Sequence, residues 1–194
     1  VFQMNIYSRL IIYVSALWVA FEISLVIRDR LQGKGTTGKD KGTRYINFIA
    51  ITVAMTASGF LNGISKFWFP GGRTLAVFWL GFALLLSGAV LRVWSIVVLG
   101  RSFRTTVEVS HDQRVVERGP YKIIRHPSYS GLLLMCCGYG VADENWLSLA
   151  IAVGLPLLAL LYRIHVEEAA LVSGIGPEYQ EYQRRTKKLI PGIW

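Results

Sequence analysis

Residues 125–131, with the sequence RHPSYSG, lie where a basic polar loop runs into an apolar segment of the chain. The dipeptide His126-Pro127 predicts an extended residue followed at once by a helix, because proline disfavours helical backbone in the residue before it and suits the first helical turn. A second charged cluster, residues 163–168, follows after a long apolar block. Two polar clusters separated by apolar sequence predict a site built at the surface of a membrane.

The apolar residues come in blocks long enough to cross a membrane. Hydrophobic residues make up 53% of the 194 residues, and a transmembrane helix needs roughly 20 apolar residues in succession. Five blocks carry the pattern, the fourth of them short for a full crossing: residues 6–27, 45–61, 74–99, 129–142 and 146–164. We therefore expect an all-α polytopic membrane protein with about five transmembrane helices, folded as a single domain over residues 1–194.

The positive charge of the chain lies almost entirely in the loops between these blocks. The formal net charge is +9, and its distribution favours anionic membrane lipids as partners over nucleic acid. Residues 28–44, residues 100–127 and the end of the chain are rich in Lys and Arg, whereas the other loops are poor in them. By the positive-inside rule we expect the N-terminus outside, and the C-terminus and both polar clusters on the cytoplasmic side.

The first apolar block is not expected to be a cleaved leader. It is long for a signal peptide and lacks a small-residue cleavage pattern. Three residues precede Met4, which we expect to be the natural start of the chain.

Two of the blocks carry a charged residue, which is costly inside a membrane. Glu22, near the far end of the first block, is expected to snorkel toward the interface or else to pair with Arg28. Arg92 in the third block is expected to face protein or a wet cavity, either pairing with an acid or touching a headgroup. Its role is left open.

The segments around the RHPSYSG stretch and after the last block are polar. Residues 100–122 favour extended structure and form a loop long enough to fold over a ligand. An amphipathic helix is predicted to begin near Pro177 and to lie on the bilayer surface. It carries Tyr179, Tyr182, Arg184, Arg185, Lys187 and Lys188.

Arg163 and Glu167 are spaced i, i+4, so they lie on one face of a predicted helix. The two residues form either a plain ion pair or part of a site. The second acid, Glu168, and the polar cluster around His126 favour a site, because acids close to hydrocarbon are expensive to place together.

The start of the helix after His126 offers groups for binding a small molecule. Its first backbone amides are open to a ligand carboxylate, and Tyr121 and Tyr129 suit stacking on a heterocycle or hydrogen bonding through their hydroxyls. The chain has three histidines, His111, His126 and His165, with no spacing that gathers them, so we expect no metal site. A glycine-rich phosphate loop and a nucleophile elbow are both lacking.

Several motifs together resemble the isoprenylcysteine carboxyl methyltransferase family, and closely an archaeal member of it. They are Gly119-Pro120-Tyr121, the RHPSYSG stretch, Glu167-Glu168-Ala169-Ala170-Leu171, Tyr179, Tyr182 and Ile190-Pro191-Gly192. The resemblance covers about residues 103–194. Phospholipid N-methyltransferases and membrane sterol reductases carry stretches similar to the Arg-His-Pro-x-Tyr-x-Gly part, so the combination is more specific than that part alone.

This resemblance implies a cytoplasmic site for S-adenosylmethionine, which leaves as S-adenosylhomocysteine, and a lipophilic or lipidated methyl acceptor such as an isoprenylcysteine. It implies three N-terminal spans in residues 1–99 and a cofactor-binding catalytic half in residues 100–194, with the loop before the fourth span and the last helix covering the cofactor. Small residues of the fourth segment, such as Gly131 and Gly138, are expected to leave room for the lipid tail.

The resemblance also implies roles for individual residues. Arg163 is expected to hold the acceptor carboxylate, and Glu167 the amino group or ribose of the cofactor. The implied catalytic set is Arg163, Glu167 and Glu168. The implied cofactor contacts are Glu108, Gln113, Arg114, Val115, Val116, Tyr121, His126, Pro127, Ser128, Tyr129 and Glu167.

Three other functions stay open at this point. Methylation of a carboxylate needs no general base, because the acceptor is already ionised at neutral pH. Methylation of a lipid amine would need one, for which Glu168 is the candidate. A reductase that uses NADPH is disfavoured by the lack of an extra basic pocket for its 2′-phosphate, and a transporter or scaffold by the lack of an inverted repeat.

Overall fold

Six α-helices dominate the part of the chain that the structure, a computed structural model, describes: residues 6–31, 40–61, 64–71, 74–107, 109 and 114–194. They are α1 (Ile6–Leu31), α2 (Thr43–Leu61), α3 (Leu75–Leu99), α4 (Pro127–Ala142), α5 (Trp146–Ile175) and α6 (Pro177–Arg185). Short 3-10 turns lie at η2 (Ser65–Phe67), η3 (Gly100–Ser102) and η4 (Gly119–Lys122). The expected chain start at Met4 falls outside the described residues.

Four of these helices are long and apolar enough to cross a membrane, namely α1, α2, α3 and α5. They expose many large hydrophobic side chains, such as Leu17, Phe48, Trp79 and Leu158, as a lipid environment favours. Together with the apolar sequence blocks, this makes the chain a multi-pass integral membrane protein. The fourth block forms α4, whose 16 residues are short for a crossing, so the count of five spans remains a prediction.

Helix α5 includes the second polar cluster, whereas α6 ends earlier than predicted. Helix α5 continues past the apolar block 146–164 to Ile175, so the cluster 163–168 lies within one continuous helix, as predicted for Arg163 and Glu167. Helix α6 ends at Arg185, because Thr186 is extended and the following residues pair with the chain near Ile124. Lys187 and Lys188 therefore lie outside the last helix.

Helix α6 was predicted to lie on the bilayer surface, and in the structure its aromatic side faces the protein. Tyr179 and Tyr182 are only 4% and 3% exposed, and both pack into the protein. The aromatic side of α6 thus closes over neighbouring segments of the chain, while its charged residues remain exposed. A helix lying flat on a bilayer would instead present its apolar side to lipid.

Helices α3 and α4 form the most extensive helix pair of the fold. Glycines permit the close approach: a Cβ on Gly88 would lie 2.5 Å from the carbonyl oxygen of Gly131, and a Cβ on Gly131 would lie 2.7 Å from that of Gly88. Gly138 meets α3 in the same way, at Gly81 and Leu85. These small residues serve helix packing, which corrects the expectation that they leave room for a lipid tail.

Glu22 and Arg92 are joined in a salt bridge between α1 and α3. The Arg92 Nε lies 2.6 Å from Glu22 Oε1, and Nη2 lies 2.8 Å from Oε2. The remaining guanidinium nitrogen donates to Ser128 Oγ at 2.9 Å. Arg28 pairs with the adjacent Asp29 instead, so both alternatives predicted for Glu22, snorkelling and pairing with Arg28, are wrong. Glu22 faces α3, where two charges within the membrane satisfy each other.

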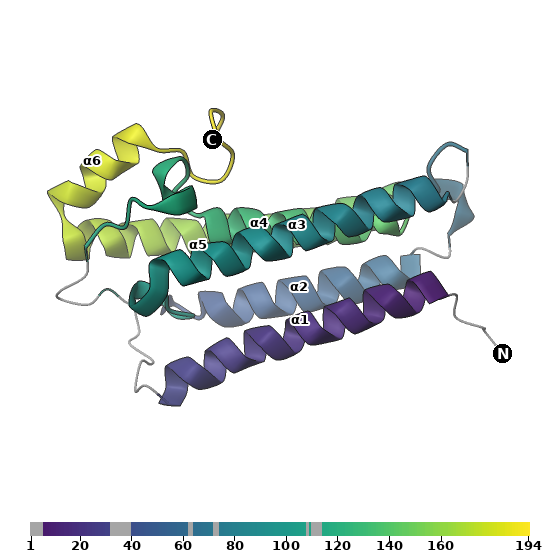
Figure 1. The fold of residues 1–194 in the computed structure, drawn as a ribbon, viewed down its shortest axis with the longest axis horizontal. Coiled ribbons are helices and arrows are strands. Elements are labelled where there is room, and N and C mark those ends of the chain that lie inside the picture. Colours follow the sequence, from purple (N-terminus) through teal and green to yellow (C-terminus); the bar gives the residue numbers. More distant parts are fainter. Residues whose placement is uncertain (1–5, 32–39, 62–63, 72–73, 108, 110–113) are drawn as a thin grey trace.

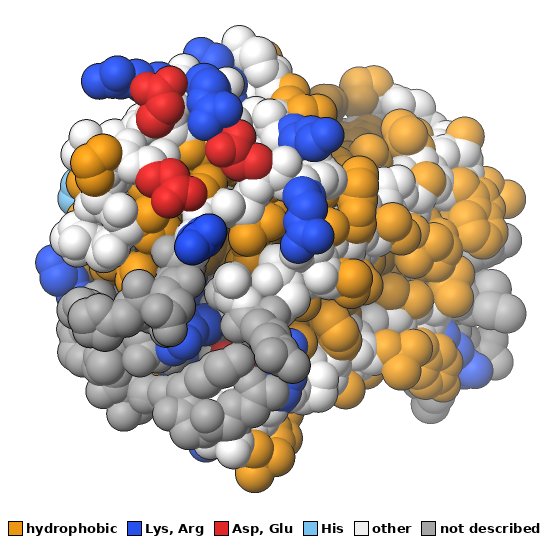
Figure 2. Space-filling model, turned by 60° about the vertical axis from the view of Figure 1, so that its left-hand side comes forward, with side chains coloured by type: hydrophobic (Ala, Val, Ile, Leu, Met, Phe, Trp, Pro, Cys, Tyr) orange, Lys and Arg blue, Asp and Glu red, His pale blue; other side chains and the backbone are white. Residues whose placement is uncertain are grey.

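The two polar clusters lie at the same end of the helix bundle (Figure 1). This site end gathers the C-terminal ends of α1, α3 and α5, the start of α2 and of α4, and α6. Lys and Arg side chains collect over it, whereas the flank of the molecule is hydrophobic (Figure 2). At the opposite end lies the turn between α4 and α5.

That turn, Asp143-Glu144-Asn145, is held by hydrogen bonds to three other segments. Asn145 caps α5 by accepting from the amides of Leu147 and Ser148, and its Nδ2 donates to the carbonyl of Ile64 at 3.1 Å. Asp143 accepts from Ser58 of α2 at 2.8 Å, and Glu144 accepts from the Thr74 amide that precedes α3. The far-end turn therefore ties α2, α3 and α5 together.

Candidate functional site

The RHPSYSG stretch is positioned by the C-terminal tail of the chain. His126 is extended and directly precedes α4, whose first residue is Pro127, as the sequence predicts. The amides of Arg125 and His126 donate to the carbonyls of Lys187 and Lys188 at 2.7 and 3.0 Å. The residues after α6 thus run beside the start of α4 and fix it relative to α6.

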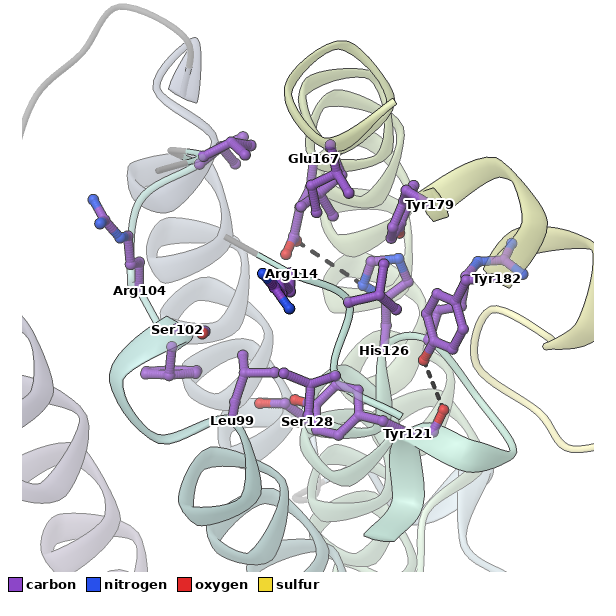
Figure 3. A pocket seen from close by; sticks show the side chains of 18 of the residues that line it. Leu99, Ser102, Arg104, Arg114, Tyr121, His126, Ser128, Glu167, Tyr179 and Tyr182 are labelled. Carbon is purple, nitrogen blue, oxygen red and sulfur yellow. Dashed lines mark hydrogen bonds and ion pairs between the residues drawn. The ribbon is translucent and has the colours of Figure 1, made fainter. Parts of the chain in front are cut away.

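A first cavity, of about 100 Å³, lies between α6, the start of α4 and the described residues 102–107, 109 and 114–116 (Figure 3). Eight of the predicted cofactor contacts line it: Arg114, Val115, Val116, Tyr121, His126, Ser128, Tyr129 and Glu167. Pro127 is fully buried in the first turn of α4 and is not part of the lining. Glu108 and Gln113 fall outside the described residues.

Glu167, His126 and Tyr129 form a compact polar group at this cavity. The Tyr129 hydroxyl donates to Glu167 Oε2 at 2.6 Å. The His126 ring stacks on the Tyr129 ring with centroids 5.5 Å apart, and its Nδ1 lies 4.0 Å from the same carboxylate oxygen. A carboxylate fixed in this way is suited to an ammonium group or to hydroxyl donors of a ligand.

The lid of this cavity is α6, held down through its tyrosines. The Tyr182 hydroxyl donates to the backbone carbonyl of Tyr121 at 2.7 Å, and Tyr179 lies beside Tyr182. Burial raises the pKa of Tyr121, Tyr179 and Tyr182 above the ordinary range. All three therefore keep their protons at neutral pH and act as hydrogen-bond donors.

A second cavity, of about 240 Å³, lies deeper among α1, α2, α3 and α5. Its wall is mainly apolar and includes Trp18, Ile23, Phe48, Ile51, Leu132 and Leu160. Arg163 lines this cavity and not the first one. Phe103, Arg104 and Tyr129 line both cavities, so the two spaces adjoin at the Tyr129 hydroxyl.

Arg163 is held by four groups at the boundary of the second cavity. Its Nε donates to the Tyr129 hydroxyl at 2.7 Å and its Nη2 to the carbonyl of Thr105 at 2.8 Å. Its Nη1 lies 3.1 Å from Thr43 Oγ1 and 3.5 Å from Asp40 Oδ1. The guanidinium is thereby oriented toward the cavity with one loosely placed counter-ion.

Arg163 and Glu167 do lie on one face of α5, but they do not form a direct ion pair within the described part of the chain. The Tyr129 hydroxyl stands between them, accepting from Arg163 and donating to Glu167. The arrangement joins a cation of the second cavity to an acid of the first through a single oxygen atom. This favours the interpretation of the pair as part of a site.

Glu168 points away from both cavities. Consecutive residues are about 100° apart around a helix, so Glu168 and Glu167 face different neighbours. Glu168 Oε1 accepts from Arg125 Nε at 2.8 Å and lies 3.3 Å from His126 Nε2, and Lys188 is 3.7 Å away. These contacts orient Arg125 and His126, and the catalytic role of Glu168 remains a prediction.

Several polar residues of the two cavities were not predicted from the sequence. Asp40 and Thr43 hold Arg163, while Asn47, Thr105 and Thr106 have buried polar atoms without hydrogen-bond partners among the described residues. Asn47 and Thr105 line the second cavity, and Thr106 lines the first. The cost of a carboxamide within an apolar block is the sequence signal that would have pointed to Asn47.

The described residues contain no group of three metal-ligating side chains close enough to hold a metal ion. The polar groups of the site are instead an acid, an arginine, a histidine and several tyrosines. They suit an organic ligand that carries an ammonium group, a carboxylate and a ring system.

Comparison with known proteins points to one family. A model of the isoprenylcysteine carboxyl methyltransferase (ICMT) family matches residues 79–173, which include the RHPSYSG stretch, Arg163 and Glu167. A probable protein-S-isoprenylcysteine O-methyltransferase of Oryza sativa subsp. indica is 31% identical over 133 residues, which cover 67% of this chain and 65% of that protein. The protein-S-isoprenylcysteine O-methyltransferase of Tribolium castaneum is 31% identical and covers 73% of this chain and 52% of that protein.

A solved structure of a eukaryotic intramembrane Ras methyltransferase, also an ICMT, has a similar fold. The TM-score is 0.66 at 30% sequence identity, over 73% of this chain and 52% of that chain. The chain therefore spans about half to two thirds of the length of these relatives.

Proposed function

The chain belongs to the isoprenylcysteine carboxyl methyltransferase family, and we propose that it is a membrane enzyme that transfers a methyl group from S-adenosylmethionine to the carboxylate of a prenylated, cysteine-like acceptor. The observation that carries this proposal is the junction of the two cavities. A cavity that combines an apolar wall with polar groups such as Glu167 and His126 and a second, mainly apolar cavity share Tyr129 in their linings, and Arg163 lines the second one.

The residues of the first cavity fit S-adenosylmethionine. Glu167 would bind its amino group or ribose, Arg114 its carboxylate, and the buried tyrosines its adenine ring. The Thr106 hydroxyl, which is buried there and has no hydrogen-bond partner in the described part of the chain, is a further donor for the cofactor. When bound, the cofactor supplies an electrophilic methyl group attached to a positively charged sulfur atom.

The residues of the second cavity fit a prenylated carboxylate. Its apolar wall would take the isoprenoid chain, and the Arg163 guanidinium would bind the carboxylate at the boundary with the first cavity. Because Asp40 lies at 3.5 Å from Arg163, the acceptor carboxylate can replace a distant counter-ion rather than break a tight ion pair. Arg163 leaves a lone pair of the carboxylate free to attack the methyl group.

The chain has little chemistry to supply beyond this placement. The acceptor carboxylate is ionised at neutral pH, so no side chain has to remove a proton. Tyr129 links the two binding groups, Arg163 and Glu167, and so fixes the distance between the two cavities. The lid α6 and the apolar wall exclude water, and alignment in a dry site is the main source of rate acceleration for such a transfer.

The proposal extends to the placement of the chain in the membrane. We place the site end on the cytoplasmic side, with the N-terminus outside and α4 as a fifth, short span, because the basic segments gather at that end. In this scheme residues 1–99 form three spans and residues 100–194 the catalytic half of a single domain. The affiliation with an archaeal member rests on the sequence resemblance.

Binding measurements on detergent-purified protein test the cofactor, and a methyl-transfer assay tests the reaction. Micromolar binding of S-adenosylhomocysteine by calorimetry, without binding of NADPH, is expected. Radiolabelled methyl groups should then pass to an S-farnesylated N-acetylcysteine in detergent. Binding of NADPH alone would make the chain a reductase, and transfer only to a lipid amine would contradict the assignment of the acceptor.

A further inference from the structure

Asn47 is a buried polar residue whose side chain has no hydrogen-bond partner in the part of the chain that the structure describes. It lies on α2, is 8% exposed and lines the second cavity. Neither its Nδ2 nor its Oδ1 has a hydrogen-bond partner among the described residues. An unbonded carboxamide is costly to bury, and more so within the membrane core, so its presence there calls for a ligand that satisfies it.

Other polar groups of α2 and α3 in this cavity are already bonded. The Thr52 hydroxyl donates to the carbonyl of Phe48 at 2.8 Å, within its own helix. Glu22 and Arg92 satisfy each other across α1 and α3. The hydroxyl of Thr105, which lines the same cavity, is also unbonded, but in Asn47 both a donor and an acceptor lack a partner among the described residues.

Asn47 lies close along α2 to the point where Arg163 is proposed to bind the acceptor carboxylate. Thr43, which lies one helical turn before Asn47, accepts from Arg163 Nη1 at 3.1 Å. Residues spaced i, i+4 have Cβ atoms roughly 5–6 Å apart on one face of a helix. Asn47 thus lies one turn deeper in the apolar cavity than the point at which α2 holds Arg163.

A carboxamide presents one acceptor and one donor side by side. This pair is complementary to the N–H and the C–O of a single amino-acid residue, which also lie side by side in an extended peptide. We infer that Asn47 recognises the cysteine part of the acceptor, with Oδ1 accepting from its amide N–H and Nδ2 donating to an oxygen of its carboxylate. This inference deepens the proposed function and rests on it.

Asn47 would then be the residue that selects an acylated cysteine over other prenylated carboxylates. Arg163 and the apolar wall recognise the carboxylate and the isoprenoid chain, which a prenylated acid without an amide also offers. Only the N–H distinguishes the end of a peptide from such an acid. Leaving Oδ1 unbonded in the complex disfavours the acid that lacks this group.

The variant Asn47→Leu, close in size to the natural side chain, tests the inference with two acceptors. One is N-acetyl-S-farnesylcysteine and the other is 3-(S-farnesyl)mercaptopropionate, which lacks the acetylamino group. Both lose the bond from Nδ2 in the variant, but only the first also loses the bond to Oδ1. We expect the ratio of kcat/KM between the two acceptors to fall by about five- to tenfold in the variant.

Thr52→Val is the matched control, because Thr52 lines the same cavity on the same helix and its hydroxyl is bonded within α2. It should change the ratio by less than about twofold. Binding of S-adenosylhomocysteine should be the same in both variants and in the natural protein, which establishes that each variant is folded. A ratio unchanged in Asn47→Leu, with both acceptors slowed equally, would overturn the inference and leave Asn47 a packing residue.

A binding experiment separates this inference from the proposed function. If the natural protein methylates neither acceptor, the proposed function fails. The binding of both compounds to protein loaded with S-adenosylhomocysteine still tests Asn47. Tighter binding of the acetylamino compound that is lost in Asn47→Leu would support its role, and the absence of any preference in the natural protein would overturn it.

Discussion

The two ends of the helix bundle both bury acids and amides, yet they do different things with them. At the far-end turn, Asp143, Glu144 and Asn145 hydrogen-bond to the starts or ends of other helices and to backbone groups. At the site end, Arg163, Glu167 and Asn47 line cavities. A polar group that is satisfied by the fold stabilises it, whereas one that faces a cavity remains available to a ligand.

Whether a polar residue faces a cavity therefore distinguishes functional from stabilising residues better than its polarity does. Each cluster is buried, and each ties together segments far apart in the sequence. Four substitutions or conditions test whether the two ends are as different as their contacts indicate, and they are ordered here by the size of the expected effect.

Replacing Arg163 by Ala should have the largest effect. The acceptor carboxylate would lose its charged partner within an apolar cavity, so kcat/KM should fall at least about a hundredfold. Cofactor affinity should change little, because Arg163 does not line the first cavity. Initial rates measure kcat/KM for the acceptor, and calorimetry with S-adenosylhomocysteine measures the cofactor affinity. The variant Arg163→Lys, which keeps the charge, should recover only part of the rate, because lysine lacks the planar fork.

Tyr129→Phe removes the one oxygen atom that joins the two cavities. Arg163 loses a hydrogen bond of 2.7 Å and Glu167 one of 2.6 Å, so both binding groups become less well placed. A fall in kcat of about ten- to a hundredfold is expected. Loss of cofactor affinity without a change in kcat would instead assign Tyr129 to cofactor binding alone.

Asn145→Ala at the far-end turn should affect stability and spare function. The change removes the N-cap of α5 and the hydrogen bonds that Asn145 Nδ2 donates to the carbonyls of Leu61 and Ile64. The expected loss is roughly 2–3 kcal/mol of unfolding free energy, seen as a lower midpoint of thermal unfolding in detergent. Binding of S-adenosylhomocysteine at low temperature should be unchanged. Weaker binding of S-adenosylhomocysteine to Asn145→Ala at low temperature would show that the two ends of the bundle are coupled.

High pH should weaken the lid and leave the far-end turn intact. Burial raises the pKa of Tyr179 and Tyr182, so the stability that their protonated forms contribute is present below the ordinary pKa near 10 and is lost as the pH rises above it. Affinity for S-adenosylhomocysteine should therefore stay level up to about pH 10 and fall beyond it. Tyr182→Phe should bind about fivefold more weakly already at neutral pH, because it lacks the bond to the Tyr121 carbonyl.

Much of the architecture was predictable from the sequence, for a local reason. Long apolar blocks have to become helices in a membrane, because backbone groups find no other partners there. His126-Pro127 marks the start of α4, and Thr74 and Gly100 flank α3 close to where its apolar block begins and ends. The distribution of Lys and Arg among the loops also predicted that the two polar clusters lie at one end of the bundle.

The partners of individual side chains were not predictable in this way. Glu22 bonds to Arg92, seventy positions along the chain, and Asp40 contacts Arg163 from the segment just before α2. Which of two neighbouring acids faces the cavity depends on the rotation of α5 about its axis, which only its packing against α2 and α4 sets. For that reason Glu167 and Glu168 were both predicted to be catalytic, although Glu167 lines the first cavity and Glu168 lines neither the first nor the second.

The sequence by itself determined that this chain is a helical membrane protein with a polar site at one end, because hydrophobic length and charge are properties of the chain alone. The resemblance of its motifs pointed to the methyltransferase family. Only the tertiary structure decided that the first and second cavities adjoin, that Tyr129 lines both of them, and that Asn47 has no hydrogen-bond partner among the described residues. These features arise where several helices meet, and contacts among them are not encoded in any one segment.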